Sequence, residues 1–341
     1  MDVQTIGTVR AMARVLSGIK PSGELTLGNY IGALRFFVAD QDVHDCFFCV
    51  VDLHAITVPQ DPAELRRRTL DIAALYMAVG LDPTKATLFV QSHVHEHTEL
   101  AWLLGCFTSF GELRRMTQFK DKTAKGGEGT ATGGLFTYPV LMAADILIYQ
   151  ADQVPVGDDQ KQHIELTRDI AERFNARFGF TFVVPEPAIP KQGARIMDLQ
   201  NPLAKMSKSD ESPQGTIGLL DTADAVRKKI KTAVTDSGRE VRAAPDKPAI
   251  TNLLTIFSAI TDEPIANLEA RFAGKGYGDF KADLADALIA FLEPIQQRYA
   301  QLIGDETALA AVLDGGARKA QAVASKTLSD AYERVGFLPR R

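Results

Sequence analysis

Short apolar runs alternate with longer stretches of helical periodicity along the first part of the chain. From the N-terminal side, the runs and the helical stretches follow one another at residues 14–17, 29–40, 45–51, 62–79, 86–91 and 98–110. The third of these reads DCFFCVV, which is typical of a strand buried on both faces. Strands that alternate with helices predict a parallel sheet with crossover connections, the doubly wound, Rossmann-type α/β class.

The helix predicted at 62–79 carries its own start and stop signals. Asp61 is placed to cap its N-terminus, Pro62 occupies its first position, and Gly80 follows its last residue. Glycines and charged residues dominate residues 120–134, which we expect to form a mobile loop.

The strand pattern ends near residue 210 and gives way to helical periodicity. The predicted helices lie at residues 221–233, 252–260, 264–272, 281–303 and 317–335. We therefore expect an N-terminal extension at 1–13, a Rossmann-type domain at 14–204, a short loop at 205–210 and a helical domain at 211–341. The pattern leaves open whether the last helix packs back on the first domain.

Composition narrows the class of protein. The chain has 341 residues, enough for about two domains, and its 45% apolar and 24% charged residues are ordinary for a globular protein. Its apolar runs fall short of the ~20 residues of a membrane helix. Three cysteines and an N-terminus without an apolar leader favour the cytoplasm. A net charge of −5 argues against a protein that coats nucleic acid, and the basic stretch at 227–231 fits a solvated helix face better than a docking site.

Cys46 and Cys49 match the CxxC spacing of redox and zinc sites. They lie in a predicted strand, which would send the two sulfur atoms to opposite faces of the sheet. We therefore expect both to be core residues.

His93, His95 and His97 alternate along the chain, so an extended segment would place all three on one face, where they could hold a metal. Only Glu96 and Glu99 lie nearby, at the start of the next helix. We therefore expect no tightly bound protein metal.

The loop between the first predicted strand and the next helix has the composition of a phosphate site. Residues 17–29 read SGIKPSGELTLGN. A doubly wound sheet binds phosphate at this place, between the carboxyl end of a strand and the N-terminus of a helix. Gly28 would let the backbone approach a ligand closely, and Thr26 and Asn29 can donate hydrogen bonds to phosphate oxygens. Taken alone, such a turn is as often structural as functional.

A second polar motif lies at the predicted domain boundary. It consists of Lys205, Met206, Ser207, Lys208 and Ser209. Lysine donors suit the negative charge that develops on transferring phosphates. By itself the motif reads as a polar linker, but the first loop and the change from α/β to helical periodicity make the combination far more specific.

The two motifs together resemble those of the class I aminoacyl-tRNA synthetases. TLGN at 26–29 is similar to the variant of their HIGH motif in which Thr and Asn replace the two histidines, and 205–209 matches their KMSKS loop at every position. Within this class, longer segments resemble the bacterial tryptophanyl-tRNA synthetase family over residues 15–341. These segments are GNYIGA at 28–33, VDLHAIT at 51–57, RMTQFK at 115–120, YPVLMAADI at 138–146, VPVGDDQKQH at 154–163 and KTAVTD at 231–236.

The resemblance implies a reaction and its partners. The carboxylate of L-tryptophan attacks the α-phosphorus of ATP, pyrophosphate leaves, and the activated tryptophan passes to tRNA(Trp) for protein synthesis. Positioning and electrostatic stabilisation would supply most of the catalysis, without a protein nucleophile. Mg²⁺ would be held by the ATP phosphates, the helical domain would recognise the anticodon, and the enzyme would be a cytoplasmic homodimer with no membrane partner.

Asp145 is the residue that the sequence singles out for the amino acid. It interrupts the apolar helical run LMAADILIY, where a buried carboxylate needs a partner, and Met142 and Tyr149 lie roughly on the same helix face. An indole N–H donates and has no acceptor function, so a carboxylate in an apolar cradle would select it. The resemblance assigns the tryptophan pocket to Asp145 at the indole nitrogen, Met142 on the ring, and Tyr138, His54 and Gln160 nearby.

The resemblance also assigns residues to catalysis and to ATP. The catalytic set is Thr26, Asn29, Lys122, Lys205 and Lys208. The ATP-binding set is Lys20, Pro21, Ser22, Gly28, Asn29, Gly157, Asp158, Asp159, Ile196, Lys205, Met206, Ser207, Lys208 and Ser209. Gly157 to Asp159 follow a short strand and start a helix, a place suited to the ATP ribose or the ligand amine. Lys122 would reach a phosphate from the loop at 120–134, and Ile196 would contact the adenine.

Two positions depart from the family pattern. The family commonly has Gln where Lys20 stands and often Phe where Leu16 stands. Both residues flank the first motif, where they can alter affinity or selectivity, and neither departure removes a catalytic group.

Three alternative functions stay open. A related nucleotidyltransferase with a HIGH motif would not need so large a helical half. A non-catalytic paralogue that acts as a regulatory or RNA-binding protein would not need Lys205, Lys208, Asp145 and Gly28 intact. A tyrosyl-tRNA synthetase shares the fold, but a phenol calls for a different set of polar groups, and the long matching segments favour tryptophan.

Overall fold

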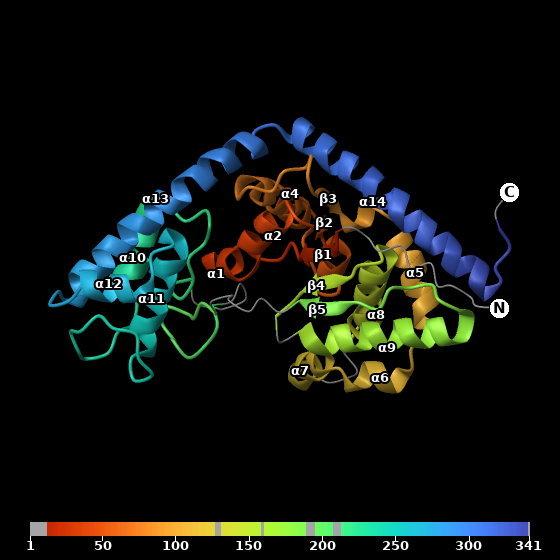
Figure 1. Cartoon of the computed structure of the whole chain (residues 1–341), viewed down its shortest axis with the longest axis horizontal. Coiled ribbons are helices and arrows are strands. Elements are labelled where there is room, and N and C mark those ends of the chain that lie inside the picture. Colours follow the sequence, from red (N-terminus) through yellow and green to blue (C-terminus); the bar gives the residue numbers. More distant parts are fainter. Residues whose placement is uncertain (1–11, 127–130, 158–159, 189–194, 207–212, 340–341) are drawn as a thin grey trace.

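The computed structural model describes residues 12–126, 131–157, 160–188, 195–206 and 213–339, apart from the side chains of 122–126. One lobe is a sheet surrounded by helices, and the other consists of helices (Figure 1). Two long helices, α13 (Tyr277–Ile303) and α14 (Glu306–Val335), arch over both lobes. Within the described part of the chain, every helix is too short or too polar to cross a membrane.

A parallel five-stranded sheet in the order β3-β2-β1-β4-β5 forms the centre of the first lobe. The strands are β1 (Arg14–Ile19), β2 (Asp45–Val50), β3 (Thr87–Val90), β4 (Gln153–Pro155) and β5 (Glu186–Ala188). The predicted doubly wound class is confirmed. The sequence pattern misses β5, because three residues that include a proline carry little strand signal, although an edge strand tolerates proline. Since β1 lies between β2 and β4, the strand order reverses at β1 and opens a crevice at the carboxyl ends.

The side chains of β2 alternate between two apolar cores, one on each face of the sheet. Cys46 packs in the first core with α4 (Pro62–Ala78), and Cys49 packs in the second with α8 (Gly133–Ile148) and α9 (Lys161–Phe178). The expectation that both cysteines are core residues on opposite faces is confirmed.

The helix predicted at 62–79 is present as α4, with the expected ends. The Asp61 side chain accepts a hydrogen bond from the Glu64 N–H at 2.9 Å, and Gly80 follows with a φ of +117°, which glycine adopts readily. The other helices are α3 (Asp52–Ala55), the 3₁₀ turn η2 (Gln91–His93), α5 (Glu96–Gly105), α6 (Phe110–Arg115), α10 (Ala223–Thr232), α11 (Pro248–Thr261) and α12 (Ile265–Arg271).

Two predictions in the first lobe need correction. The helix expected at 29–40 is divided into α1 (Leu27–Asn29), a π-helical stretch (Tyr30–Leu34) and α2 (Arg35–Asp40). Of the stretch expected to be a loop at 120–134, residues 120–126 belong to α7 (Thr117–Gly126), and α8 begins at Gly133. A short polar helix has nearly the composition of a loop, so composition alone does not separate the two.

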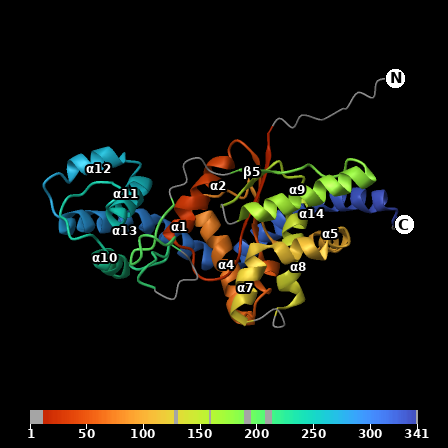
Figure 2. The same cartoon turned by 90° about the horizontal axis from the view of Figure 1, so that it is seen from below.

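Helix α14 leaves the helical lobe and packs across the α/β lobe, which answers the question that the pattern leaves open. It contacts β3 and α5 (Figures 1 and 2). Gly316 lies so close to β3 that a β-carbon there would come within 1.7 Å of the Leu88 carbonyl oxygen. Farther along, the Tyr332 hydroxyl donates to Glu99 Oε2 at 2.9 Å. The last helix therefore packs on the α/β lobe, although it follows α13 of the helical lobe in the chain.

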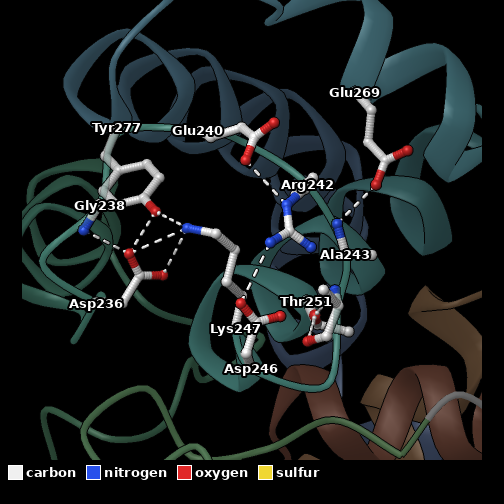
Figure 3. Close-up of polar contacts among 11 residues, drawn as sticks. Asp236, Gly238, Glu240, Arg242, Ala243, Asp246, Lys247, Thr251, Glu269 and Tyr277 are labelled. Atoms are coloured by element: carbon white, nitrogen blue, oxygen red, sulfur yellow. Dashed lines mark hydrogen bonds and ion pairs between the residues drawn. The ribbon is translucent and has the colours of Figure 1, made fainter.

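A polar network fixes the loop between α10 and α11 (Figure 3). Lys247 Nζ donates to Asp236 Oδ1 at 3.1 Å and to the Tyr277 hydroxyl at 2.8 Å, and that hydroxyl donates to Asp236 Oδ1 at 2.7 Å. Tyr277 is the first residue of α13. The network therefore holds the end of the KTAVTD segment against the start of α13.

Residues 195–206 are hydrogen-bonded to the helical lobe. Asn252 of α11 accepts from the Met197 N–H at 2.8 Å and donates to the Met197 carbonyl at 2.9 Å. The Val234 N–H donates to the Leu199 carbonyl at 2.8 Å. The boundary predicted near residue 205 therefore lies at the end of a segment that is already hydrogen-bonded to the helical lobe. The sequence pattern does not indicate these contacts, because a short extended segment gives no periodic signal of its own.

Candidate active site

A cavity of about 420 Å³ opens at the carboxyl ends of β1 and β4, where the strand order reverses. Its size suits a small molecule. It is lined, among others, by the five residues predicted for tryptophan and by two of those predicted for ATP: His54, Tyr138, Met142, Asp145 and Gln160, together with Lys20 and Gly157. Residues that lie more than a hundred positions apart in the chain thus meet in one cavity.

Asp145 is an acidic residue in the wall of this cavity. Its Oδ1 accepts hydrogen bonds from Gln91 Nε2 at 2.7 Å and from His97 Nδ1 at 2.6 Å, and its Oδ2 lies 2.8 Å from His54 Nε2. Burial alone would raise the pKa of Asp145, but the hydrogen bonds from His54 and His97 outweigh burial and hold that pKa well below its ordinary value. The carboxylate is therefore ionised and can accept a further N–H donor.

A second polar group of the cavity is Tyr138. Its hydroxyl donates to Gln118 Oε1 at 3.2 Å and lies 2.9 Å from His163 Nε2. Burial raises the pKa of Tyr138 to about 12, so the hydroxyl keeps its proton. The Tyr138 ring stands edge-on to the His54 ring, with centroids 6.2 Å apart. The two rings and the Asp145 carboxylate give the cavity a flat-sided, partly aromatic outline.

Thr26 and Asn29 form a capping box at the start of α1. The Thr26 N–H donates to Asn29 Oδ1 at 2.9 Å, and the Asn29 N–H donates to Thr26 Oγ1 at 3.3 Å. The side-chain oxygen of Asn29 accepts a hydrogen bond within the cap, so the NH₂ group of Asn29 is the group that would donate to a phosphate. The same residues thus shape the loop and offer a donor to a ligand.

The two sequence motifs meet where the lobes join. A β-carbon at Gly28 would lie 3.5 Å from the β-carbon of Met206, which is buried. The Met206 N–H donates to the Ile196 carbonyl at 2.9 Å. The Leu27 N–H donates to the Ile217 carbonyl at 2.7 Å. The segments before and after the 205–210 loop are therefore both anchored at α1. Met206 packs against it, and the Ile217 carbonyl accepts a hydrogen bond from it.

The remaining predicted residues fall into three groups. Lys205 forms an antiparallel bridge with Met197, and Ile196 is buried in the core that joins the lobes. Pro21 and Ser22 follow β1 in a turn in which the Ser22 N–H donates to the Lys20 carbonyl at 2.8 Å. The last group lies outside the described residues: Asp158, Asp159, Ser207, Lys208, Ser209 and the side chain of Lys122.

Sequence reasoning named His54 for the pocket but missed Gln91 and His97, the other two partners of Asp145. Gln91 directly follows β3, and that position at the carboxyl end of a strand is the signal that could have found it. The segment with the three histidines is not extended: His93 ends η2 and His97 lies in α5, which begins at Glu96, so His95 is exposed and His97 is buried. In the part of the chain that the structure describes, no group of three or more His, Cys, Asp or Glu residues is placed to hold a metal.

A doubly wound sheet whose phosphate loop meets a lysine-bearing loop at the junction with a helical lobe is the architecture of the class I aminoacyl-tRNA synthetases. The chain belongs to this family: the family model described as tRNA synthetases class I (W and Y) matches residues 9–293. The Tryptophan--tRNA ligase 2 of Streptomyces avermitilis is 58% identical, over 96% of this chain and 98% of that protein. The Tryptophan--tRNA ligase of Mycobacterium leprae is 54% identical, over 98% of this chain and 100% of that protein.

Solved structures agree with this assignment. The tryptophanyl-tRNA synthetase of Mycoplasma pneumoniae superposes with a TM-score of 0.87 at 42% identity, covering 96% of this chain and 98% of that one. The enzyme of Campylobacter jejuni, in complex with ADP and tryptophan, superposes with a TM-score of 0.84 at 37% identity, covering 95% of this chain and 100% of that one. The resemblance seen in the sequence motifs is confirmed over nearly the whole chain.

Proposed function

We propose that this chain is a ligase that activates L-tryptophan with ATP and attaches it to tRNA. Relatives that are 54–58% identical over nearly their whole length carry this activity in their names. One observation of the site supports tryptophan in particular. An ionised Asp145 carboxylate, held by three donors, lies in the wall of a cavity of about 420 Å³.

The indole of tryptophan fits this cavity chemically. Its N–H donates and does not accept, so it pairs with an acceptor-only carboxylate. Asp145 Oδ2 takes one hydrogen bond, from His54, among the described residues and has a second lone pair for the indole. Met142 would pack on the ring, and Tyr138 and Gln160 would lie near the rest of the amino acid.

ATP would lie with its phosphates between the first motif and the 205–210 loop. An oxygen of the tryptophan carboxylate attacks the α-phosphorus, the bond from that phosphorus to the bridging oxygen breaks, and pyrophosphate carries away the electron pair. Thr26 and Asn29 would hold the phosphates from the cap of α1. Lys205, Lys208 and Lys122 would neutralise the leaving group, and such preorganised donors supply most of the rate in reactions of this kind.

Other residues would bind the rest of the ATP molecule. The ribose would contact the segment from Gly157 to Asp159, and the adenine would lie by Ile196. Lys20, Pro21 and Ser22, which follow β1, would also contact ATP. The described residues offer no set of carboxylates for a magnesium ion. We therefore assign Mg²⁺ to the substrate, as an ion that arrives on the phosphate oxygens of ATP.

The helical lobe would bind the anticodon of tRNA(Trp). Its basic stretch on α10 is partly neutralised within the lobe, where Arg227 pairs with Asp286 and Lys229 pairs with Asp221. The enzyme would act as a homodimer in the cytoplasm. Trp102 and Phe110 are 78% and 68% exposed, and large apolar side chains of this kind are suited to burial against a second copy.

The test is ATP–pyrophosphate exchange measured with each of the twenty amino acids. We expect tryptophan alone to support exchange, and the same preparation to charge tRNA(Trp). Exchange that depends on tyrosine would replace this proposal with a tyrosyl-tRNA synthetase. Absence of exchange with all twenty amino acids would indicate a paralogue without this activity.

A further inference from the structure

A chain of hydrogen-bonded side chains ends at the Asp145 carboxylate. His97 Nδ1 lies 2.6 Å from Asp145 Oδ1, and His97 Nε2 lies 2.7 Å from the Tyr149 hydroxyl. His97 comes from α5, whereas Asp145 lies in α8 and Tyr149 follows one turn later. His97 and Tyr149 are buried.

The carboxylate sets the direction of the hydrogen bond that positions it. A carboxylate only accepts, so His97 Nδ1 donates to Asp145. Burial raises the pKa of Tyr149 well above its ordinary value, so the hydroxyl keeps its proton and is a neutral partner for His97 Nε2. His97 is therefore held at both ring nitrogens, with Nδ1 directed at Asp145.

Aromatic packing keeps this chain rigid. The Tyr149 ring stacks on Phe47 with centroids 4.9 Å apart, and the Phe89 ring flanks His97 at 6.1 Å. A histidine held by packing on its faces and by hydrogen bonds at both nitrogens has little freedom to turn. The carboxylate that it bonds is restrained with it.

The two oxygens of Asp145 accept hydrogen bonds from different residues. Oδ1 receives both His97 and Gln91, and these two donors are fully or almost fully buried. Oδ2 receives His54, a residue of α3 that lines the cavity and whose side chain is 13% exposed; His97 also lines the cavity, but its side chain is only 1% exposed. Turning the carboxylate would break the bonds at Oδ1, so Oδ2 stays toward His54 and the cavity.

We propose that His97 is a positioning residue for the amino-acid substrate: it fixes the Asp145 carboxylate so that Oδ2 accepts the indole N–H, and it thereby strengthens selection against rings without that N–H. This inference rests on the proposed function, because it takes tryptophan as the ligand of the cavity. In metal sites, losing a residue that orients a ligating side chain through a hydrogen bond costs about 10- to 100-fold in affinity or activity, and the same reasoning applies to a carboxylate that binds an N–H donor.

Two isosteric replacements of His97 test the proposal. The amide nitrogen of Asn reaches roughly the place of Nδ1 and would still donate to Asp145, whereas that of Gln reaches the place of Nε2 and would point to Tyr149. The control is Phe89→Leu, which loosens the packing around the same ring and removes no hydrogen bond.

The readout is the ratio of kcat/KM for tryptophan to kcat/KM for β-(1-benzothiophen-3-yl)alanine, in which sulfur replaces the indole N–H. We expect His97→Gln to lower this ratio at least tenfold, and His97→Asn and Phe89→Leu to keep it within about threefold of wild type. Thermal unfolding of all three variants measures how much stability each one loses, so that a change in the ratio can be compared with a change in stability. A merely structural role would lower both kcat/KM values together and leave the ratio unchanged.

The outcomes separate this inference from the proposed function. If Asp145→Asn abolishes the discrimination but His97→Gln and His97→Asn both keep it, His97 does not position the carboxylate and the inference is wrong. If His97→Gln does not fold, a lowered ratio in His97→Asn also overturns the inference, because that variant retains the donor to Asp145. If wild-type enzyme does not use tryptophan at all, the proposed function itself fails.

Discussion

Replacing Asp145 with asparagine tests the charge in the cavity with almost no change of shape. The asparagine must place one oxygen and one NH₂ group where the carboxylate has two acceptors. The Oδ1 position faces two donors, Gln91 and His97, and the Oδ2 position faces one, His54. The amide oxygen will therefore take the Oδ1 position, and the NH₂ group will take the Oδ2 position toward the cavity.

The size of the effect follows from this orientation. An indole N–H would then meet a donor in place of a charged acceptor. The loss combines a hydrogen bond to a charged group with a buried donor left without a partner, about 2–4 kcal/mol together. At about 1.4 kcal/mol for each factor of ten, kcat/KM for tryptophan should fall about 30- to 1000-fold. The preference for tryptophan over tyrosine and phenylalanine should shrink with it.

The assay is ATP–pyrophosphate exchange at varied concentrations of each amino acid, with ATP saturating. Asp45→Asn is the matched control, since Asp45 starts β2 in the same sheet and pairs with Arg14, and neither residue lines the cavity. The control should keep its kcat/KM for tryptophan within about twofold. A kcat/KM for Asp145→Asn within threefold of wild type, with selectivity retained, would refute the reasoning and make Asp145 a structural residue.

Three further predictions concern other parts of the molecule. Lys208→Ala should slow adenylate formation about 10²–10³-fold in single-turnover kinetics while tryptophan binding by titration changes little, and an unchanged activation rate would remove Lys208 from the catalytic set. Lys20→Gln should raise KM for ATP or tryptophan several-fold, most clearly at low salt, because ordinary ionic strength screens charges over about 8–10 Å; identical constants at two salt concentrations would mean that Lys20 does not contact either substrate. Gly316→Ala should lower stability by about 1–3 kcal/mol in urea unfolding, since its β-carbon would collide with the Leu88 carbonyl. Gly315→Ala meets only the end of Arg318 at 3.9 Å and should be neutral or stabilising, so equal effects at 315 and 316 would contradict the close packing of α14 on β3.

Local features of the site could be predicted because their signals lie within a few residues. The capping box of Thr26 and Asn29 is three residues long, and Asp145 stands out as a charge in an apolar helix. The same holds for α4, whose cap and terminal glycine flank it directly. The hydrogen bonds that join Asp145 to its partners have no such local signal, since Gln91, His97 and His54 lie 54, 48 and 91 positions away. The alternation of the three histidines does not indicate the contact of His97 with Asp145 either, because it places them on one face only in an extended chain, whereas α5 begins at Glu96.

Periodicity, helix end signals and short motifs predicted the fold class, the two motifs at 26–29 and 205–209, and Asp145 as a candidate residue for the substrate, because such signals act over one or two turns of chain. The rest depends on contacts between distant segments. The chain reverses its strand order at β1, which brings α3, α5 and α8 to one cavity and gives Asp145 three donors. It also folds α14 back across β3, where only a glycine at 316 allows the helix to approach the Leu88 carbonyl. Such contacts join segments far apart in the chain, and the free energy that selects them comes from packing both faces of the sheet at once rather than from any local preference.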